Sequence, residues 1–323
     1  MTRAPAVIAH RGASGYLPEH TREAKVLAYG QGADFVEQDV VATRDGHLVV
    51  LHDLFLDQVT DVAARFPGRA RDDGRHYVID FDLDEIKALR VRERRRPDGP
   101  QPLFPERFRD DAVAFRVATL DEELRLVQEL NRETGRNVGI CPEIKHPDFH
   151  RRHGIDLARR LLETLAAFGY RSAEDRVFVQ CFDASELKRC REALGTRLRL
   201  AQLVEDDRPF PDPGALAEIA SYAEILGPHF AQLVDVRRAG EGVAVVETAD
   251  TALAAATAGL ELYPYTFRRD QVPAFFPTFE ALLAFFFEEV AVSGVFCDHP
   301  DIAVRVRDGL ARRTSGERGE ARR

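Results

Sequence analysis

Short apolar runs alternate with longer amphipathic stretches along most of the chain. The runs have the length of buried strands, and the stretches repeat apolar residues at the spacing of helices that cover a core. Helix caps support this pattern: Glu19–Gln31 ends at Gly32, and Leu120–Thr134 follows Thr119, with Glu122 in its first turn. The expected strands begin near residues 6, 34, 138, 176, 198, 223, 260 and 294. Strands and helices alternating in this number are typical of a (β/α)8 TIM barrel, an α/β fold whose chemistry lies at the carboxyl ends of the strands.

An antiparallel hairpin interrupts the alternation near the start of the chain. Residues 43–46 have the composition of a turn (Thr-Arg-Asp-Gly) and separate two apolar runs. A connection this short cannot make a parallel crossover, so we expect antiparallel pairing with Ala42 opposite Leu48 and Gln38 opposite His52. The hairpin therefore brings His52 alongside the second barrel strand.

Residues 54–118 break the rhythm a second time. They are rich in Arg, Asp and Pro, so we expect a small insertion subdomain after the second barrel strand. We interpret its run Arg92–Arg96 as a solvated surface. Further along, Val245–Ala258 has the pattern of a helix. The sequence therefore predicts one barrel domain at 1–311, which contains this subdomain, and a disordered tail at 312–323.

The composition is that of a soluble globular protein and narrows the possible partners. Of 323 residues, 45% are hydrophobic and 31% are charged, and the net charge of -9 argues against nucleic acid as a partner. The most apolar stretch, Ala281–Val292, is too short to cross a bilayer, so we expect no stable membrane insertion.

The first residues hold no signal-peptide core, which favours the cytoplasm, whereas a leader removed from the chain would favour the periplasm. The four cysteines have no C-x-x-C spacing and are expected to be buried thiols.

Carboxylates near the ends of two strands are the first candidate chemistry. Glu37 and Asp39 alternate on one strand and so share a face, and Glu143 and Lys145 repeat this spacing on the next barrel strand. Two bare carboxylates this close raise each other's pKa unless a cation separates them. Three carboxylates and water suit one divalent cation, Ca²⁺ or Mg²⁺. The alternative is an ion-pair cluster without metal, in which Lys145 binds Glu143 or Asp39.

Two histidines and an arginine accompany these carboxylates. His10 ends the first strand and His52 ends the hairpin. Imidazole titrates near neutral pH, so the pair fits a general acid and a general base, although each alone would be read as a capping or core residue. Arg11 can hold a phosphate oxygen or pair with Glu37. Three aromatic residues after later strands belong either to the core or to an apolar wall for a substrate: Phe182, Tyr265 and Phe267.

Five motifs follow one another along the chain. They are H-R-G-A-S-G-Y-L-P-E-H-T at 10–21, E-Q-D at 37–39, T-R-D-G-H-L-V-V-L-H-D at 43–53, P-E-I-K at 142–145 and D-H-P-D at 298–301. Together they resemble the glycerophosphodiester phosphodiesterases, which are metal-dependent TIM-barrel hydrolases. The insertion resembles that of a bacterial subgroup often found in the periplasm. The chain departs from the family at His20, where many members have Asn, at Cys297, where Thr is common, and in lacking a tryptophan after the seventh strand.

The resemblance implies a role for each of the polar candidates. It implies that the divalent cation is bound by Glu37, Asp39 and Glu143. It also implies that His10 and His52 form the acid/base pair. The positively charged side chains of Arg11 and Lys145 would hold the phosphate.

The activity that the resemblance implies is hydrolysis of small-molecule glycerophosphodiesters to sn-glycerol 3-phosphate and an alcohol. One histidine would take the proton of the glycerol 2-hydroxyl, which attacks phosphorus, and the other would protonate the leaving alcohol. Water would then open the cyclic phosphate, and either histidine fits either role. Two alternatives are a related lysophospholipase D or sphingomyelinase D activity, which needs an apolar lipid-accepting face, and a catalytically silent phosphodiester-binding protein. The charged insertion argues against the first, and the intact histidines and carboxylates argue against the second.

Overall fold

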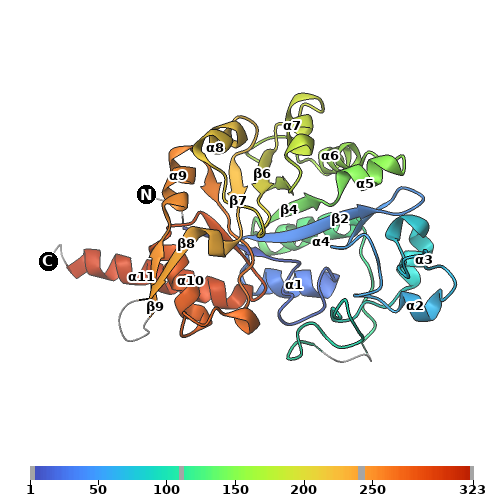
Figure 1. Cartoon of the computed structure of the whole chain (residues 1–323), viewed down its shortest axis with the longest axis horizontal. Helices are drawn as coiled ribbons and strands as arrows, with labels where there is room; N and C mark the ends of the chain where they lie inside the picture. The colour runs from blue at the N-terminus through green and yellow to red at the C-terminus, as the bar shows by residue number, and fades with distance from the viewer. Residues whose placement is uncertain (1–3, 109–112, 239–243, 321–323) are drawn as a thin grey trace.

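Eight parallel strands form a nearly closed barrel in the computed structural model, which describes residues 4–108, 113–238 and 244–320 (Figure 1). The strand order is β10-β7-β6-β5-β4-β2-β1-β11. Backbone hydrogen bonds join the two outer strands of this order, from Ser293 N to Leu262 O at 3.0 Å and from Phe296 N to Pro264 O at 3.0 Å. The predicted TIM barrel is confirmed. Its strands are β1 (Ala6–Ala9), β2 (Phe35–Ala42), β4 (Gly139–Ile144), β5 (Phe178–Cys181), β6 (Arg199–Leu203), β7 (Ile225–Gly227), β10 (Glu261–Leu262) and β11 (Gly294–Cys297).

Helices surround the barrel on its outside (Figure 1). The start of helix α4 is fixed by a helix cap at Thr119, as the sequence predicts. The Thr119 side chain accepts a hydrogen bond from Glu122 N, and the Glu122 side chain accepts one from Thr119 N. None of the helices in the described ranges is long and apolar enough to cross a membrane. The main helices are α1 (Arg22–Gly30), α4 (Leu120–Thr134), α5 (Pro147–Arg152), α6 (Leu157–Ala167), α7 (Ala184–Glu192), α8 (Pro213–Ala220), α9 (Asp250–Thr257), α10 (Phe279–Glu288) and α11 (Pro300–Glu320).

Two apolar layers hold the barrel together. Alternate residues of a strand enter opposite layers, so Ile8 of β1 points into the barrel while Val7 and Ala9 belong to the layer beneath the helices. The inner layer also contains Phe178 and Phe296. Polar side chains replace this packing at the carboxyl ends of the strands, and there the candidate site lies.

The segment 54–118, called the insertion lobe below, packs beside the barrel around an apolar cluster that it shares with Val41, Val49 and Leu51 of the hairpin. Strand β3 (Leu48–Val50) leads into it and pairs antiparallel with β2, with Ala42 opposite Leu48 as predicted. Figure 1 shows α2 and α3 of the lobe to one side of the barrel. The described residues of the lobe form three short helical turns: α2 (Val62–Arg65), η1 (Val78–Asp80) and α3 (Leu83–Ala88).

Two segments differ from the sequence-based expectation. The segment 245–248 is a strand rather than the start of a helix, because β9 (Ala244–Thr248) pairs with β8 (Val234–Arg238) in a separate hairpin. Helix α9 begins only at Asp250, where alanines replace the β-branched residues. Helix α11 continues through the predicted disordered tail as far as Glu320. Its first turns bury Ile302 and Ala303, and once a helix is nucleated each added residue gains a hydrogen bond at small cost.

Candidate active site

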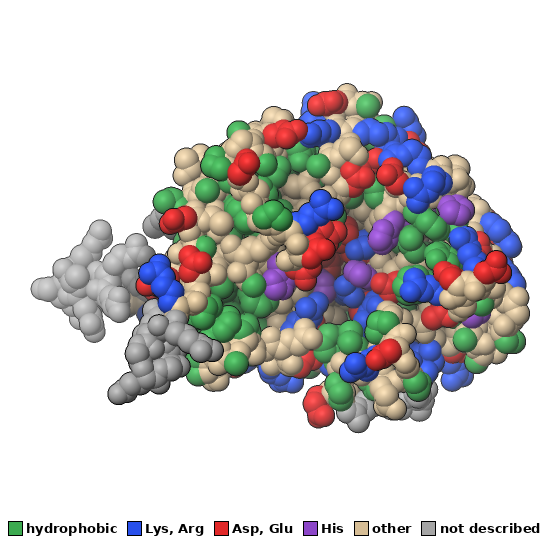
Figure 2. Space-filling view, viewed as in Figure 1, with side chains coloured by type: hydrophobic (Ala, Val, Ile, Leu, Met, Phe, Trp, Pro, Cys, Tyr) green, Lys and Arg blue, Asp and Glu red, His purple; other side chains and the backbone are tan. Residues whose placement is uncertain are grey.

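A cavity of about 220 Å³ opens at the carboxyl ends of the barrel strands. Figure 2 shows acidic, basic and histidine side chains gathered in a hollow near the centre of one face of the molecule. The structure brings nine of the ten predicted site residues together in the cavity wall, namely His10, Arg11, Glu37, Asp39, His52, Glu143, Lys145, Phe182 and Tyr265.

Three buried carboxylates lie side by side in this wall. Glu37 and Asp39 come from β2 and Glu143 from β4, and the register of the two strands sets Asp39 directly opposite Glu143. One oxygen from each lies within 4.8 Å of the others. Gln180 on β5, which the sequence analysis passed over, donates to Glu37 at 2.9 Å.

The electrostatics of the three carboxylates fit a bound cation. Burial raises the pKa of Glu143 to about 8, and although Lys145 opposes this rise, Asp39 adds to it. Burial also raises the pKa of Glu37. Asp39 Oδ1 is buried and has no hydrogen-bond partner within the described part of the chain. A divalent cation would supply the missing partner and favour the ionised form of all three groups.

Two cationic side chains border the carboxylates. Lys145 Nζ lies 2.7 Å from Glu143 Oε1. Arg11 Nε lies 3.5 Å from Asp39 Oδ2, and Arg11 Nη1 donates to both oxygens of Glu19 at 3.0 Å. The backbone of Arg11 turns with a φ of 57°, and its N–H donates to Glu37 Oε2 at 2.8 Å. The pairing of Arg11 is therefore chiefly with Glu19, and its backbone rather than its guanidinium contacts Glu37.

Each histidine has a carboxylate on its Nδ1 atom. His10 Nδ1 lies 2.6 Å from Asp298 Oδ1, and His52 Nδ1 lies 2.6 Å from Asp53 Oδ1. The pKa of Asp298 is held well below its usual range, since Arg268, His10 and Arg107 outweigh its burial. An ionised carboxylate can only accept, so the proton sits on Nδ1 of each ring, and Nε2 is left as the base.

The electrostatic surroundings of His52 keep it neutral. Burial, Arg11 and Lys145 lower its pKa to about 3. Its Asp53 partner stays ionised, because the hydrogen bond from His52 and the charge of Arg94 outweigh burial and lower the pKa of Asp53. A neutral ring with a free Nε2 is the form that accepts a proton.

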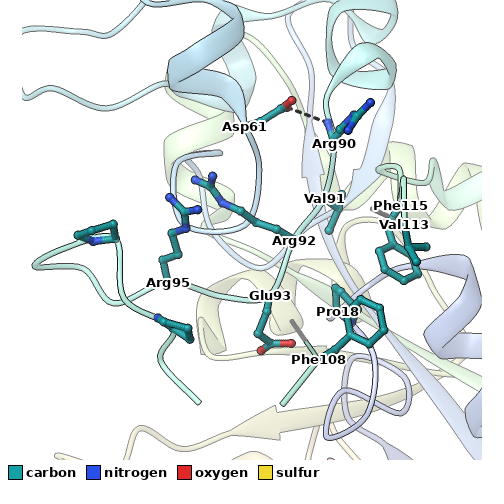
Figure 3. A pocket seen from close by; sticks show the side chains of 12 residues that line it. Pro18, Asp61, Arg90, Val91, Arg92, Glu93, Arg95, Phe108, Val113 and Phe115 are labelled. Carbon is teal, nitrogen blue, oxygen red and sulfur yellow. Dashed lines mark hydrogen bonds between the residues drawn. The ribbon is translucent and has the colours of Figure 1, made fainter. Parts of the chain in front are cut away.

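The sequence patterns did not identify Arg94 and Arg107 as residues of the site. The expectation of a solvated run at Arg92–Arg96 is wrong for Arg94, which is buried and donates to Asp53 and to Glu19. Its neighbours Arg92, Glu93 and Arg95 line a cavity inside the lobe (Figure 3). Arg94 instead points toward Asp53 and Glu19, which lie outside the lobe. Because the adjacent residues Arg92 and Glu93 line the same cavity, no two-residue periodicity could have singled out Arg94.

Of the three aromatic residues predicted to line the substrate site, two do so and one does not. Phe182 and Tyr265 line the cavity with their ring centroids 5.9 Å apart. Phe267 is fully buried between the barrel and α10, with its ring 4.9 Å from that of Phe286, so the expectation that it forms a substrate wall is wrong. The chain beyond β10 is irregular, and a spacing of two residues there does not keep side chains on one face.

A wider groove of about 840 Å³ adjoins the cavity next to His52. Its walls include the aromatic side chains of Phe149 on α5 and of Phe182 and Tyr265 in loops, and the exposed carboxylates of Glu205 and Asp206. The groove shares Glu143 and Lys145 with the cavity, so a molecule bound across both would place its middle beside the carboxylates and the histidine.

Comparisons with known proteins agree on one family. The model of the glycerophosphoryl diester phosphodiesterase family matches residues 10–302. A glycerophosphodiester phosphodiesterase of Haemophilus influenzae is 41% identical over 94% of this chain and 90% of the relative, and one of Treponema pallidum is 35% identical over 93% and 90%.

Solved structures share the fold. A glycerophosphodiester phosphodiesterase from Agrobacterium tumefaciens has a TM-score of 0.62 at 22% identity, over 93% of this chain and 98% of the other. An Oleispira antarctica phosphodiesterase, solved in complex with the product sn-glycerol-3-phosphate, has a TM-score of 0.64 at 19% identity, over 94% and 97% of the two chains.

Proposed function

The chain belongs to the glycerophosphoryl diester phosphodiesterase family, and on that premise we propose that it hydrolyses glycerophosphodiesters to sn-glycerol 3-phosphate and an alcohol. One observation carries the proposal. Two histidines whose Nδ1 atoms are each held by a carboxylate face the same cavity as three carboxylates with oxygens within 4.8 Å of one another. Acid, base and cation-binding groups thus surround a space in which one phosphodiester fits.

Phosphate binding falls to the cationic groups of the cavity. Arg11 and Lys145 line it and neutralise the negative charge of the phosphodiester. The carboxylates Glu37, Asp39 and Glu143 would hold one divalent cation, and both Ca²⁺ and Mg²⁺ take such oxygen donors. When bound, the cation stabilises the charge that develops on the phosphoryl oxygens.

Proton transfer falls to His10 and His52. The free Nε2 of one ring takes the proton of the glycerol 2-hydroxyl, the hydroxyl oxygen bonds to phosphorus, and the bond to the alcohol breaks. The other ring carries a second proton, on Nε2, and gives it to the leaving alkoxide, while both rings keep the Nδ1 proton that binds their carboxylates. In the second half the roles reverse: water loses a proton to one ring and attacks the cyclic phosphate, and the 2-oxygen is protonated as it leaves. The wider groove beside His52 supports a place for the leaving alcohol.

A turnover assay tests the proposal. The full chain is incubated with glycerophosphocholine and Ca²⁺ or Mg²⁺, glycerol 3-phosphate is measured enzymatically, and phosphorus NMR follows any cyclic phosphate. We expect turnover that a chelator and Glu37→Gln both abolish, while Glu163→Gln, at an exposed site on α6, leaves it intact. Turnover that resists the chelator would remove the cation from the scheme. Cleavage of lysophosphatidylcholine but not of glycerophosphocholine would replace the proposal with a lysophospholipase D activity, and no cleavage of either would indicate a binding protein.

A further inference from the structure

The insertion lobe places two buried arginines behind the candidate site, against carboxylates that bind its histidines. Arg94 Nη1 donates to Asp53 Oδ2 at 2.6 Å, and Arg107 Nη2 donates to Asp298 Oδ2 at 2.7 Å. Both side chains are more than nine-tenths buried. These contacts connect residues of the lobe to carboxylates that lie outside it, on the barrel and at the end of the β3 segment.

The two contacts share one geometry. In each case a carboxylate gives one oxygen to the Nδ1 of a histidine and the other oxygen to an arginine of the lobe, so the chains of contacts are His10–Asp298–Arg107 and His52–Asp53–Arg94. A carboxylate held on both oxygens cannot rotate, and the imidazole bound to it is fixed in orientation and tautomer. Asp298 Oδ2 also accepts from Arg268 Nε at 3.0 Å, so Arg107 shares this carboxylate with a residue outside the lobe. The lobe therefore contacts the carboxylates of both histidines that the proposed reaction needs.

Each arginine is itself held in place by a second carboxylate. Arg94 binds Glu19 with two hydrogen bonds, from Nε at 2.8 Å and from Nη2 at 2.6 Å. Arg107 binds Asp270 in the same two-pronged way, at 2.7 and 3.0 Å, and its guanidinium carbon lies 3.6 Å from the centre of the Phe104 ring. Such paired bonds fix the plane of a guanidinium, which lysine could not do.

Glu19 extends the influence of Arg94 to the phosphate-binding side. Both of its oxygens also accept from Arg11 Nη1 at 3.0 Å. Arg94 thus contacts His52 through Asp53 and Arg11 through Glu19. Arg107 contacts His10 through Asp298, and among the described residues no carboxylate joins it to Arg11.

We propose that the insertion lobe is a positioning element for catalysis, in which Arg94 orients His52 and Arg107 orients His10. Neither arginine lines the cavity, so neither touches substrate, and both act through carboxylates. The inference rests on the proposed function, since it assigns a purpose to the orientation of two histidines.

The test replaces each arginine with methionine and with lysine and compares Arg69→Met as the matched control. Arg69 is also an arginine of the lobe, stacked on Phe81 and bound to Glu85, but its partners lie within the lobe. With glycerophosphocholine and Ca²⁺, we expect kcat to fall about 100-fold in Arg94→Met, the loss typical of a misplaced reacting group. The fall in Arg107→Met should be smaller but still above twofold, because Arg268 continues to bind Asp298. The KM should stay within about threefold in Arg107→Met and rise further in Arg94→Met, because only Arg94 supports Arg11. Lysine should restore part of kcat.

A second measurement does not depend on turnover. Nitrogen-15 NMR of the histidine rings reports which ring nitrogen carries the proton. We expect His10 and His52 to be protonated on Nδ1 in the parent chain, and the ring next to each lost arginine to shift toward the Nε2 form. If the methionine variants do not fold, Asp53→Asn and Asp298→Asn, which keep the side-chain shape, should give the same kcat loss and ring shifts.

The outcomes separate the two proposals. A tautomer shift in a chain that cleaves no phosphodiester would end the proposed function and leave the positioning role standing. A kcat in Arg94→Met and Arg107→Met within twofold of that in Arg69→Met would overturn the inference, as would ring tautomers that none of the variants changes.

Discussion

Lys25 Nζ lies 3.2 Å from His20 Nδ1 in the protein interior, and this contact decides where the imidazole carries its proton. An ammonium group only donates, so Nδ1 must accept and the proton must sit on Nε2. Nε2 lies 2.6 Å from Asp39 Oδ2 and donates to it. Lys25 is held in turn by Glu123, at 3.3 Å, and by the carbonyl oxygen of Glu37. A buried network behind the site thus fixes one of the candidate metal ligands.

Removing the donor to Asp39 should weaken cation binding. We expect His20→Ala to lower Ca²⁺ affinity about 10- to 100-fold, because the ligand loses the partner that fixes its orientation. His20→Gln places an amide N–H near the position of Nε2 and should retain most of the affinity. Calorimetric titration with Ca²⁺ measures both, and equal affinity in the alanine variant and the parent chain would show that Asp39 needs no support.

Loss of His52 should reduce turnover without releasing the cation. We expect His52→Ala to lower kcat by about 10²- to 10⁴-fold, the contribution of a positioned acid or base. Its side chain does not contact the three carboxylates through any hydrogen bond in the described chain, so Ca²⁺ affinity should stay the same. His47→Ala, at an exposed position on the same hairpin, is the control. Parent-like turnover in His52→Ala would sink the acid/base assignment.

The carboxyl group of Glu93 should make stability depend on pH. Its side chain lines the cavity inside the lobe (Figure 3), its Oε2 has no hydrogen-bond partner among the described residues, and burial raises its pKa from 4.5 to about 8. A group whose pKa is higher in the folded state stabilises the fold fully below pH 4.5 and loses that contribution as the pH rises through 8.

Glu93→Gln removes this titration. Between pH 5 and 8 the slope of unfolding free energy against pH should change by up to about 1.4 kcal/mol per unit, the value of one proton. The variant should gain stability relative to the parent chain as the pH rises. Urea unfolding at several pH values measures the slope, and a curve parallel to that of Glu163→Gln would show that Glu93 ionises freely.

Two aromatic residues that were both predicted to form the substrate wall should respond differently to substitution by alanine. Phe267 packs in the outer core, so Phe267→Ala should lower the free energy of unfolding by about 3–5 kcal/mol. Phe182 is half-buried in the cavity wall, so Phe182→Ala should chiefly raise KM. Denaturant unfolding and steady-state kinetics distinguish them, and a rise in KM without loss of stability in Phe267→Ala would return that residue to the substrate wall.

The sequence predicts those parts of the site whose positions follow from regular local patterns. Strand spacing places Glu37, Asp39 and Glu143 correctly because alternation on a strand and pairing between parallel neighbours are regular. The partners of Arg94 and Arg107 could not be foreseen in this way, since Asp53 and Asp298 lie 41 and 191 residues away along the chain. A charged run is usually solvated, and only the packing of the lobe on the barrel shows which of its members is buried.

The contact between His10 and Asp298 joins positions 288 residues apart, and the strands that they directly follow, β1 and β11, lie side by side. During synthesis on the ribosome, both histidines and all three candidate metal ligands are added to the chain before half of it is made. The carboxylate that holds His10 emerges only with the last barrel strand. Until then one edge of β1 has no partner and its histidine has no fixed orientation. Because β11 pairs with β1, the site can be assembled only after the last barrel strand has been made.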